Sequence, residues 1–341
     1  MTASSAGSLI QKSTIVRANS TVKARAVRLA FGVLERRAPG LGSVWAERLW
    51  CTIPSAKKPR PVIAEPGTVV TLALHAPTPA PGRGAAPTFV AEAWGTDGPV
   101  VYLLHGWGGY RGQLGAFVAP LTAAGYRVVA LDAPSHGESA PGSFGRGRSL
   151  ITEFIAALDA ATREFGPAHG VVAHSLGGGA AALAVLDHVD GLDGVPVGRL
   201  VLVAPMPDPN AYAQLFAATL GFGDRIRTGL LRRLERRVGR PMTDFDAVTR
   251  ARTAAESRDA AGDADPAPPL LVVHDREDKE IPYGLGRAIA AAWQGAELLS
   301  TKGLGHRRIL RDPEVVRTAV DFLGAVQVQG AAPAGRRSSA A

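Results

Sequence analysis

A single serine stands where two different stretches of sequence meet. The apolar run GVVAH (170–174) ends at Ser175, glycines follow at 177–179, and an alanine-rich helical run begins at once. A strand that turns sharply into a helix around one serine exposes the hydroxyl, as the pattern G-x-S-x-G describes. Gly177 matches its second glycine, and Ala173 replaces the first with one extra methyl group. We expect Ser175 to be a nucleophile rather than a helix-capping serine.

A serine hydroxyl needs a general base, and the base needs an acid that orients it. The stretch LLVVHDREDKEIP (270–282) ends an apolar strand with carboxylates, and KGLGHRRIL (302–310) places His306 after the last predicted strand. Both follow strand ends, where an α/β sheet builds its site. His306 is the expected base. Asp275 and Asp278 remain alternatives for the acid, with Asp208 a more distant one.

The loop HGWGG (105–109) follows the first core strand, where a backbone N–H can help to bind an oxyanion. His105 is expected to support that loop, and His174 to be structural. We expect Asp132 and His136 to fix a further loop. No metal site is expected from His105, His136 and Asp132, because their spacing matches no ligand motif.

The elements that position these groups alternate along the chain. From residue 100 onward, short apolar strands at 100–106, 126–134, 170–175, 199–205 and 269–275 alternate with helical patterns at 113–125, 149–166, 175–189, 283–293 and 313–326. Continuously apolar strands between helices are typical of a mostly parallel sheet covered by helices on both faces. Residues 67–76 and 88–94 predict an additional hairpin at the sheet edge.

Two helical regions do not fit this alternation. Residues 206–266 contain three helical patterns and no strand, which predicts a cap insertion over the strand ends. Residues 22–50 predict two helices separated by APGLGS (38–43). The expected organisation is an N-terminal tail and helical extension (1–66), a core domain (67–327) that contains the cap, and a disordered C-terminal tail (328–341).

Together these motifs carry a family resemblance. From about residue 100 to 326 the chain resembles the α/β-hydrolase superfamily through HGWGG, DAPSHGES (132–139), AHSLGG (173–178), HDREDKEIP and GLGHRRIL. The resemblance implies an α/β-hydrolase fold with Ser175 as nucleophile, His306 as base and Asp278 as acid, ahead of Ile281-Pro282. It also implies an oxyanion hole made by the backbone N–H groups of Trp107 and Leu176, with His105, Gly106 and Gly177 in support.

The expected activity is hydrolysis of a carboxylic ester through an acyl-enzyme, without a cofactor, on a small-molecule acyl substrate. Amide, thioester, lactone or peptide hydrolysis and acyl transfer use the same residues. A non-catalytic ligand-binding protein is the alternative from another class. Apolar cap residues either line an acyl pocket or pack the cap onto the core: Leu215, Phe216, Leu220, Phe222 and Leu231.

Composition limits the partners. The net charge is +8, and the basic residues gather in two clusters: Lys12, Arg17, Lys23, Arg25, Arg28, Arg36 and Arg37, then Arg225, Arg227, Arg232, Arg233, Arg236, Arg237 and Arg240. Solvated helix faces are the expected explanation, with weak association to an anionic surface and no nucleic-acid partner. One cysteine, Cys51, excludes a disulfide within the chain. We expect no membrane span and a cytoplasmic location.

Overall fold

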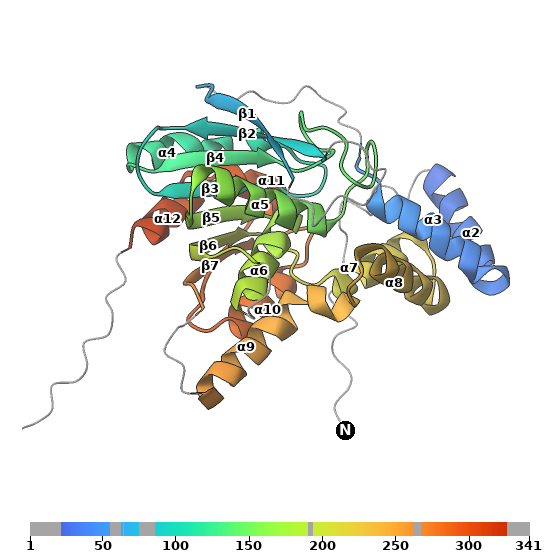
Figure 1. Cartoon of the computed structure of the whole chain (residues 1–341). Coiled ribbons are helices and arrows are strands. Elements are labelled where there is room, and N and C mark those ends of the chain that lie inside the picture. Colours follow the sequence, from blue (N-terminus) through green and yellow to red (C-terminus); the bar gives the residue numbers. More distant parts are fainter. Residues whose placement is uncertain are drawn as a thin grey trace, which may run out of the picture.

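The computed structural model describes residues 22–54, 63, 65–74, 86–189, 194–261 and 267–325. An eight-stranded sheet forms its centre, in the order β1-β2-β4-β3-β5-β6-β7-β8 (Figure 1). The strands are β1 (Thr68–Ala73), β2 (Thr88–Trp94), β3 (Val100–Leu104), β4 (Arg127–Asp132), β5 (Ala168–His174), β6 (Val197–Val203), β7 (Leu270–Asp275) and β8 (Glu297–Thr301). Strands β1 and β2 are antiparallel to their neighbours, and all other pairs are parallel. The predicted mostly parallel sheet is confirmed.

Successive residues of the central strands point into two separate apolar layers. On β3, Tyr102 and Leu104 face one layer whereas Val101 and Leu103 face the other. The first layer contains α5 (Ile151–Phe165), α6 (Leu176–Val189) and α10 (Tyr283–Ala292). The second contains η1 (Arg111–Phe117), α4 (Val118–Ala123) and α12 (Pro313–Gly324). Helices therefore cover both faces, which explains why the strand sequences are apolar without alternation.

The insertion between β6 and β7 is helical, as its sequence predicts. It consists of α7 (Pro209–Leu220), α8 (Asp224–Val238), the 3₁₀ turn η2 (Met242–Phe245) and α9 (Ala247–Ala261). Helix α8 buries Ile226, Leu230 and Leu234, four residues apart, and leaves arginines on its other face. Gly221 follows α7 and Gly239 follows α8, both in the left-handed conformation that favours glycine.

A helical hairpin that precedes the sheet packs on this insertion. Helices α2 (Val22–Arg37) and α3 (Pro39–Cys51) contact α7 and α8 respectively (Figure 1). Phe31 of α2 stacks on Trp45 of α3 at 4.2 Å between ring centroids, and Phe31 also touches Phe222 of the insertion. Two parts of the chain that lie far apart in sequence thus form one helical layer.

Polar contacts fasten the hairpin to the insertion. Arg28 donates to the carbonyl groups of Ala218 and Thr219 at the end of α7. Glu47, which is buried, forms ion pairs with Arg233 and Arg237 of α8. Part of the central basic cluster is therefore ion-paired with the hairpin, although the Arg237 side chain remains 42% exposed.

Two predicted elements differ from the structure. Residues 38–43 do not form a connecting loop, because Ala38 alone separates the helices and Pro39 starts α3, where its missing N–H costs nothing. The glycine at 42 serves packing, since a Cβ there would collide with Ile226 of α8. The helix predicted over 113–125 is the 3₁₀ segment η1 followed by the short α4.

Residues 1–21 of the predicted N-terminal tail and extension, and the predicted C-terminal tail at 328–341, lie outside the described residues. Within the described residues, no helix combines the length and the apolarity that a membrane crossing requires. The division of the chain at residues 66 and 327 stays a prediction.

Candidate active site

Ser175 occupies a strained turn between β5 and α6. Its φ of 55° lies in the left-handed region, which costs a non-glycine residue energy. Three backbone hydrogen bonds hold it there: its N–H donates to Val203 at 3.0 Å, and its carbonyl accepts from Met206 at 3.0 Å and Gly179 at 3.2 Å. The strain is thus fixed by the neighbouring strand end, and the hydroxyl is presented at the carboxyl edge of the sheet.

Small residues let the chain approach this turn closely. A Cβ at Gly177 would collide with the carbonyl oxygen of His105, and one at Gly106 would lie 2.8 Å from Ser175 Cβ. Ala173, by contrast, is fully buried in the apolar layer beneath the turn. The methyl group that departs from G-x-S-x-G is therefore accommodated in the core.

His306 and Asp278 lie in line with the serine hydroxyl. His306 Nε2 is 3.1 Å from Ser175 Oγ, and His306 Nδ1 is 2.7 Å from Asp278 Oδ2. An ionised carboxylate only accepts hydrogen bonds, so Nδ1 carries the proton and Nε2 accepts from the hydroxyl. The structure brings the three predicted residues together, with His306 on the short helix α11 (Gly305–Arg308).

The Asp278 side chain is completely buried. It stays ionised because hydrogen-bond donors of the protein surround its carboxylate. Burial alone would raise its pKa, but hydrogen bonds from His274 and His306 and from the Ile281 amide hold the pKa well below its usual range. Oδ1 accepts the N–H groups of Glu280 at 2.7 Å and Ile281 at 3.0 Å. The carboxylate is therefore fixed in charge and in orientation.

Asp275, the other candidate acid, has a different task. Its carboxylate accepts the Thr301 hydroxyl at 2.8 Å and the amides of Glu277 and Leu304 at 2.9 Å. These bonds connect the end of β7 to the loop that carries His306. Burial opposes ionisation of Asp275, yet the donors lower its pKa. Of the two predicted alternatives, only Asp278 contacts His306.

The two residues predicted to supply oxyanion-binding amides, Trp107 and Leu176, line the same cavity as Ser175. Leu176 is the first residue of α6, so its N–H has no acceptor within the helix. Trp107 lies in the loop after β3, where its neighbour Gly109 closes a turn onto the Gly106 carbonyl at 3.0 Å. His105 accepts the Ala133 N–H at 3.1 Å and donates to the Gly106 carbonyl at 2.7 Å, so it fixes this loop as predicted.

The fully buried Asp132 braces the same loop from outside. Asp132 accepts the Arg111 amide and the Arg111 guanidinium, each at 2.6 Å, and the Glu138 amide at 2.9 Å. Arg111 in turn pairs with Glu92 of β2 at 2.6 Å. Asp132 thus holds the segment after β3 and the segment after β4 together. No group of three or more metal-ligating side chains occurs in the described part of the chain.

A family comparison agrees with this arrangement. A model of the alpha/beta hydrolase family matches residues 101–319, more than half of the chain and a span that contains Ser175, Asp278 and His306. The chain belongs to the alpha/beta hydrolase family. The helical hairpin α2–α3 lies outside the matched residues.

Individual similar proteins are distant from this α/β hydrolase. Alpha/beta hydrolase domain-containing protein 10 from mouse is 13% identical with a TM-score of 0.51, over 75% of this chain and 96% of that one. A bromoperoxidase from Bacillus anthracis is 17% identical with a TM-score of 0.50, over 75% and 99%. At such identities the likeness concerns the fold.

One curated relative shares a shorter segment with this α/β hydrolase. It is the dihydrolipoyllysine-residue acetyltransferase component of the acetoin cleaving system from Cupriavidus necator, 34% identical over 136 residues. The match covers 40% of this chain and 30% of that protein. The matched segment therefore spans less than a third of that relative's length.

Two further histidines contact the site. His174 Nε2 donates to the His306 carbonyl at 2.9 Å, and the two rings lie 4.5 Å apart. His274 Nε2 is 3.1 Å from the Ile281 carbonyl and 3.4 Å from Asp278 Oδ2. His174 is structural as expected, but its contact places it behind the base. His274 was missed, although its position four residues before Asp278 in HDRED was a usable signal.

The environment of His174 predicts a pH effect on stability. Burial and the neighbouring His306 hold its pKa well below the ordinary value, so it stays neutral when folded. Below about pH 6.5 the unfolded chain binds a proton at this residue that the folded chain does not bind. The free energy of unfolding therefore decreases by up to about 1.4 kcal/mol for each unit by which the pH is lowered. We expect His174→Gln to reduce the number of protons taken up on unfolding by about one. Urea unfolding between about pH 5 and 7 measures this number as the slope of the free energy of unfolding against pH. An unchanged slope would contradict a neutral buried His174.

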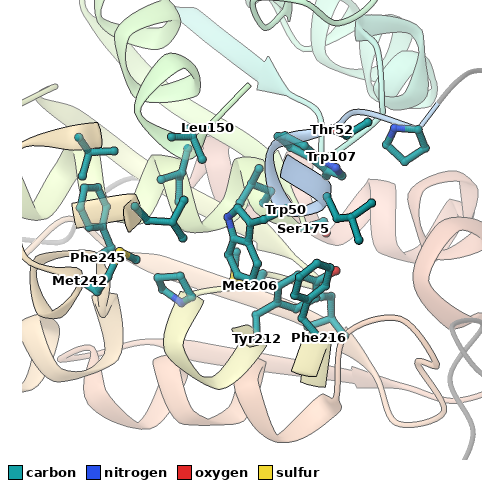
Figure 2. A pocket seen from close by; sticks show the side chains of 18 residues that line it. Trp50, Thr52, Trp107, Leu150, Ser175, Met206, Tyr212, Phe216, Met242 and Phe245 are labelled. Carbon is teal, nitrogen blue, oxygen red and sulfur yellow. The ribbon is translucent and has the colours of Figure 1, made fainter. Parts of the chain in front are cut away.

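Ser175 opens into a cavity of about 280 Å³ between the core and the helical layer (Figure 2). Its walls are almost entirely aliphatic and aromatic. Helix α3 contributes Leu49 and Trp50, and the Trp50 ring meets Phe216 of α7 edge-on at 5.3 Å. Figure 2 shows Met242 and Phe245 at one end of the cavity, away from Ser175.

The cap residues named from sequence divide between the two predicted roles. Phe216 lines the cavity, whereas Phe222 is buried against Phe31 of the hairpin. Leu220 and Leu231 pack on the apolar layer, and Leu215 is not among the lining residues. The α3 wall was missed, because no local sequence signal shows that residues 49–54 lie beside residues 209–216.

Proposed function

We propose that this α/β hydrolase cleaves carboxylic esters that carry an apolar acyl chain. The observation that carries the proposal is the hydrogen-bonded line from Ser175 Oγ through His306 to Asp278, which opens into an apolar cavity. A serine in such a line is activated for acyl transfer chemistry. The apolar cavity beside it suits the hydrocarbon part of the substrate.

In the proposed mechanism, His306 Nε2 takes the proton of Ser175 as Oγ attacks the ester carbonyl. Asp278 holds Nδ1–H and stabilises the imidazolium that forms. His306 then gives the proton to the alcohol as the C–O bond breaks, which leaves an acyl-enzyme on Ser175. Water, deprotonated by His306, attacks that ester, and the carboxylic acid leaves as the serine regains its proton.

The negative charge of each tetrahedral intermediate would be received by the amides of Trp107 and Leu176. Both are backbone groups on braced segments, so they need no reorganisation during the reaction. Each donor of this kind contributes on the order of 3 kcal/mol to transition-state stabilisation. The N-terminus of α6 adds a favourable dipole at the same point.

The cavity volume supports a medium-length acyl chain. A dry apolar cavity of about 150 Å³ accommodates a benzene ring. The cavity here has about 280 Å³, which is space for a chain of roughly eight to ten carbons. Each buried methylene adds about 0.8 kcal/mol of favourable transfer energy until the cavity is full.

We therefore expect kcat/KM for p-nitrophenyl esters to rise from acetate to octanoate or decanoate and to fall at longer chains. Phe245→Ala should raise the laurate-to-octanoate ratio of kcat/KM by at least about tenfold, because it opens the far end of the cavity. Leu215→Ala, on the same cap, is the matched control. The ratio of two esters on one sample is independent of the folded fraction, and an unchanged ratio would contradict the assigned acyl pocket.

The first test of the proposal is labelling with a fluorescent fluorophosphonate, which reacts only with an activated serine. We expect the full chain to be labelled, and octanoate ester to suppress labelling by competition. A folded protein that is neither labelled nor able to turn over any ester of the series would refute the proposed activity.

Acyl transfer is a second candidate, favoured by one observation. The relative from Cupriavidus necator that shares 136 residues is named an acetyltransferase component. An acyl-enzyme that prefers an alcohol to water would give a transfer product from the same triad. Product analysis with and without added alcohols separates the two activities.

A further inference from the structure

The most exposed large apolar side chains are concentrated on one helical hairpin. Among the described residues, five large apolar side chains are strongly exposed, and four of them lie on α2 and α3. Leu29 and Val33 of α2 are 72% and 58% exposed, and Leu41 and Val44 of α3 are 67% and 45% exposed. Such a concentration differs from the scattered exposed apolar residues of ordinary surfaces.

These four side chains form one outer face, which we call the hairpin face. Spacings of four residues on α2 and three on α3 place each pair on one side of its helix. The opposite sides bury Phe31 and Ala46 in the layer shared with α7 and α8. Both helices cover the same insertion (Figure 1) and each exposes these residues to solvent, so we infer that the two exposed sides adjoin.

The hairpin face is surrounded by positive charge. The exposed arginines of the two helices are Arg25, Arg36, Arg37 and Arg48. The acidic residues of α2 and α3 turn inward, since Glu35 accepts the amides of Gly223 and Ile226 and Glu47 pairs with arginines of α8. No carboxylate of these two helices therefore offsets the arginines.

We propose that the hairpin face docks on an anionic lipid surface. The aliphatic side chains enter the boundary between headgroups and acyl chains, and the arginines bind the lipid phosphates. A nucleic acid would use the arginines and leave the four aliphatic side chains in water. A second copy of this chain, meeting the same face symmetrically, would set the arginines against one another.

Helix α3 also connects this face to the cavity. Val44 and Arg48 lie on its outer side, and Leu49 and Trp50 at its C-terminal end line the cavity beside Ser175. Docking would thus bring the α3 wall of the cavity close to the lipid, where esters with apolar chains accumulate. This consequence rests on the proposed function, whereas docking itself does not.

The test is flotation of the full chain with vesicles of equal parts phosphatidylglycerol and phosphatidylcholine, and with pure phosphatidylcholine vesicles. We expect binding to the anionic vesicles that weakens as salt increases. Leu29→Gln/Val33→Gln should lower the partition coefficient at least about tenfold. Arg36→Gln/Arg37→Gln/Arg48→Gln should lower it by a similar or larger factor.

Two matched controls isolate the face. Val69→Gln alters the fifth exposed apolar residue, on β1, and Arg287→Gln/Arg311→Gln/Arg317→Gln removes the same charge elsewhere. Both should bind like the unchanged chain, and melting temperatures should agree. Ser175→Ala should also bind normally, so the result is independent of ester hydrolysis.

Several outcomes would overturn the proposal. These are absence of anionic-vesicle binding at low salt, equal binding of the face variants and the controls, and a dimer that Leu29→Gln/Val33→Gln dissociates without any vesicle binding. Retention of duplex DNA without vesicle binding would assign the arginines to a nucleic acid instead.

Discussion

Ser175→Ala is expected to lower kcat for the octanoate ester by roughly 10⁴- to 10⁶-fold and to abolish fluorophosphonate labelling. The reason is that the acyl-enzyme cannot form without Oγ, which lies 3.1 Å from His306 Nε2. His306→Ala should cause a loss of similar size, because the hydroxyl then lacks its base. The measurements are steady-state kinetics and gel labelling at neutral pH.

Combining the two substitutions gives the sharper result. Residues that act as one unit are strongly non-additive, so Ser175→Ala/His306→Ala should be no slower than either single variant. Additive losses would mean that the two residues act independently, against the geometry. Unchanged melting temperatures serve as the control for folding.

Asp278→Asn is expected to lower kcat by about 10²- to 10⁴-fold while KM changes little. Asp278 Oδ1 accepts the amides of Glu280 and Ile281, so an asparagine would keep its oxygen there. Its amide group would then face His306 Nδ1 and donate to it. The imidazole proton would move to Nε2, where it blocks acceptance of the serine proton.

Asp275→Asn is the matched comparison for this variant. Its carboxylate contacts Thr301 and the Leu304 amide but not His306, so the tautomer of the base should persist. We expect a lower melting temperature and a much smaller loss of kcat than for Asp278→Asn. A larger catalytic loss from Asp275→Asn would show that the acid has been assigned to the wrong carboxylate.

The order of strands and helices along the chain could be predicted from the sequence, because strands buried on both faces form continuous apolar runs. Residues 270–273, for example, are all apolar, HDRED begins at 274, and β7 ends at Asp275. The start of α3 was not readable, because glycine and proline usually interrupt helices. Here Pro39 occupies the first turn, and Gly42 allows contact with Ile226.

The site was predictable to the extent that it follows strand ends. Ser175, Asp278 and His306 each lie shortly after the end of a strand of the same parallel sheet, so topology alone brings them near one another. Asp278 could be separated from Asp275 only by resemblance or by coordinates, since both side chains are buried and hydrogen-bonded. The wall that Trp50 supplies depends on a contact between distant segments, which local sequence does not encode.

The same contact between distant segments affects how the protein folds during its synthesis. Arg28 binds carbonyl groups 190 and 191 residues further along the chain, and Glu47 binds Arg233, 186 residues further along. During synthesis at about 5–20 residues per second, the hairpin waits on the order of ten to forty seconds for these partners to leave the ribosome. Until then its inner side, including Phe31 and Trp45, lacks its cover. Helices α2 and α3, which are synthesised long before α7 and α8, are thus secured only after those later helices exist, and slow translation lengthens the interval in which their apolar side is exposed.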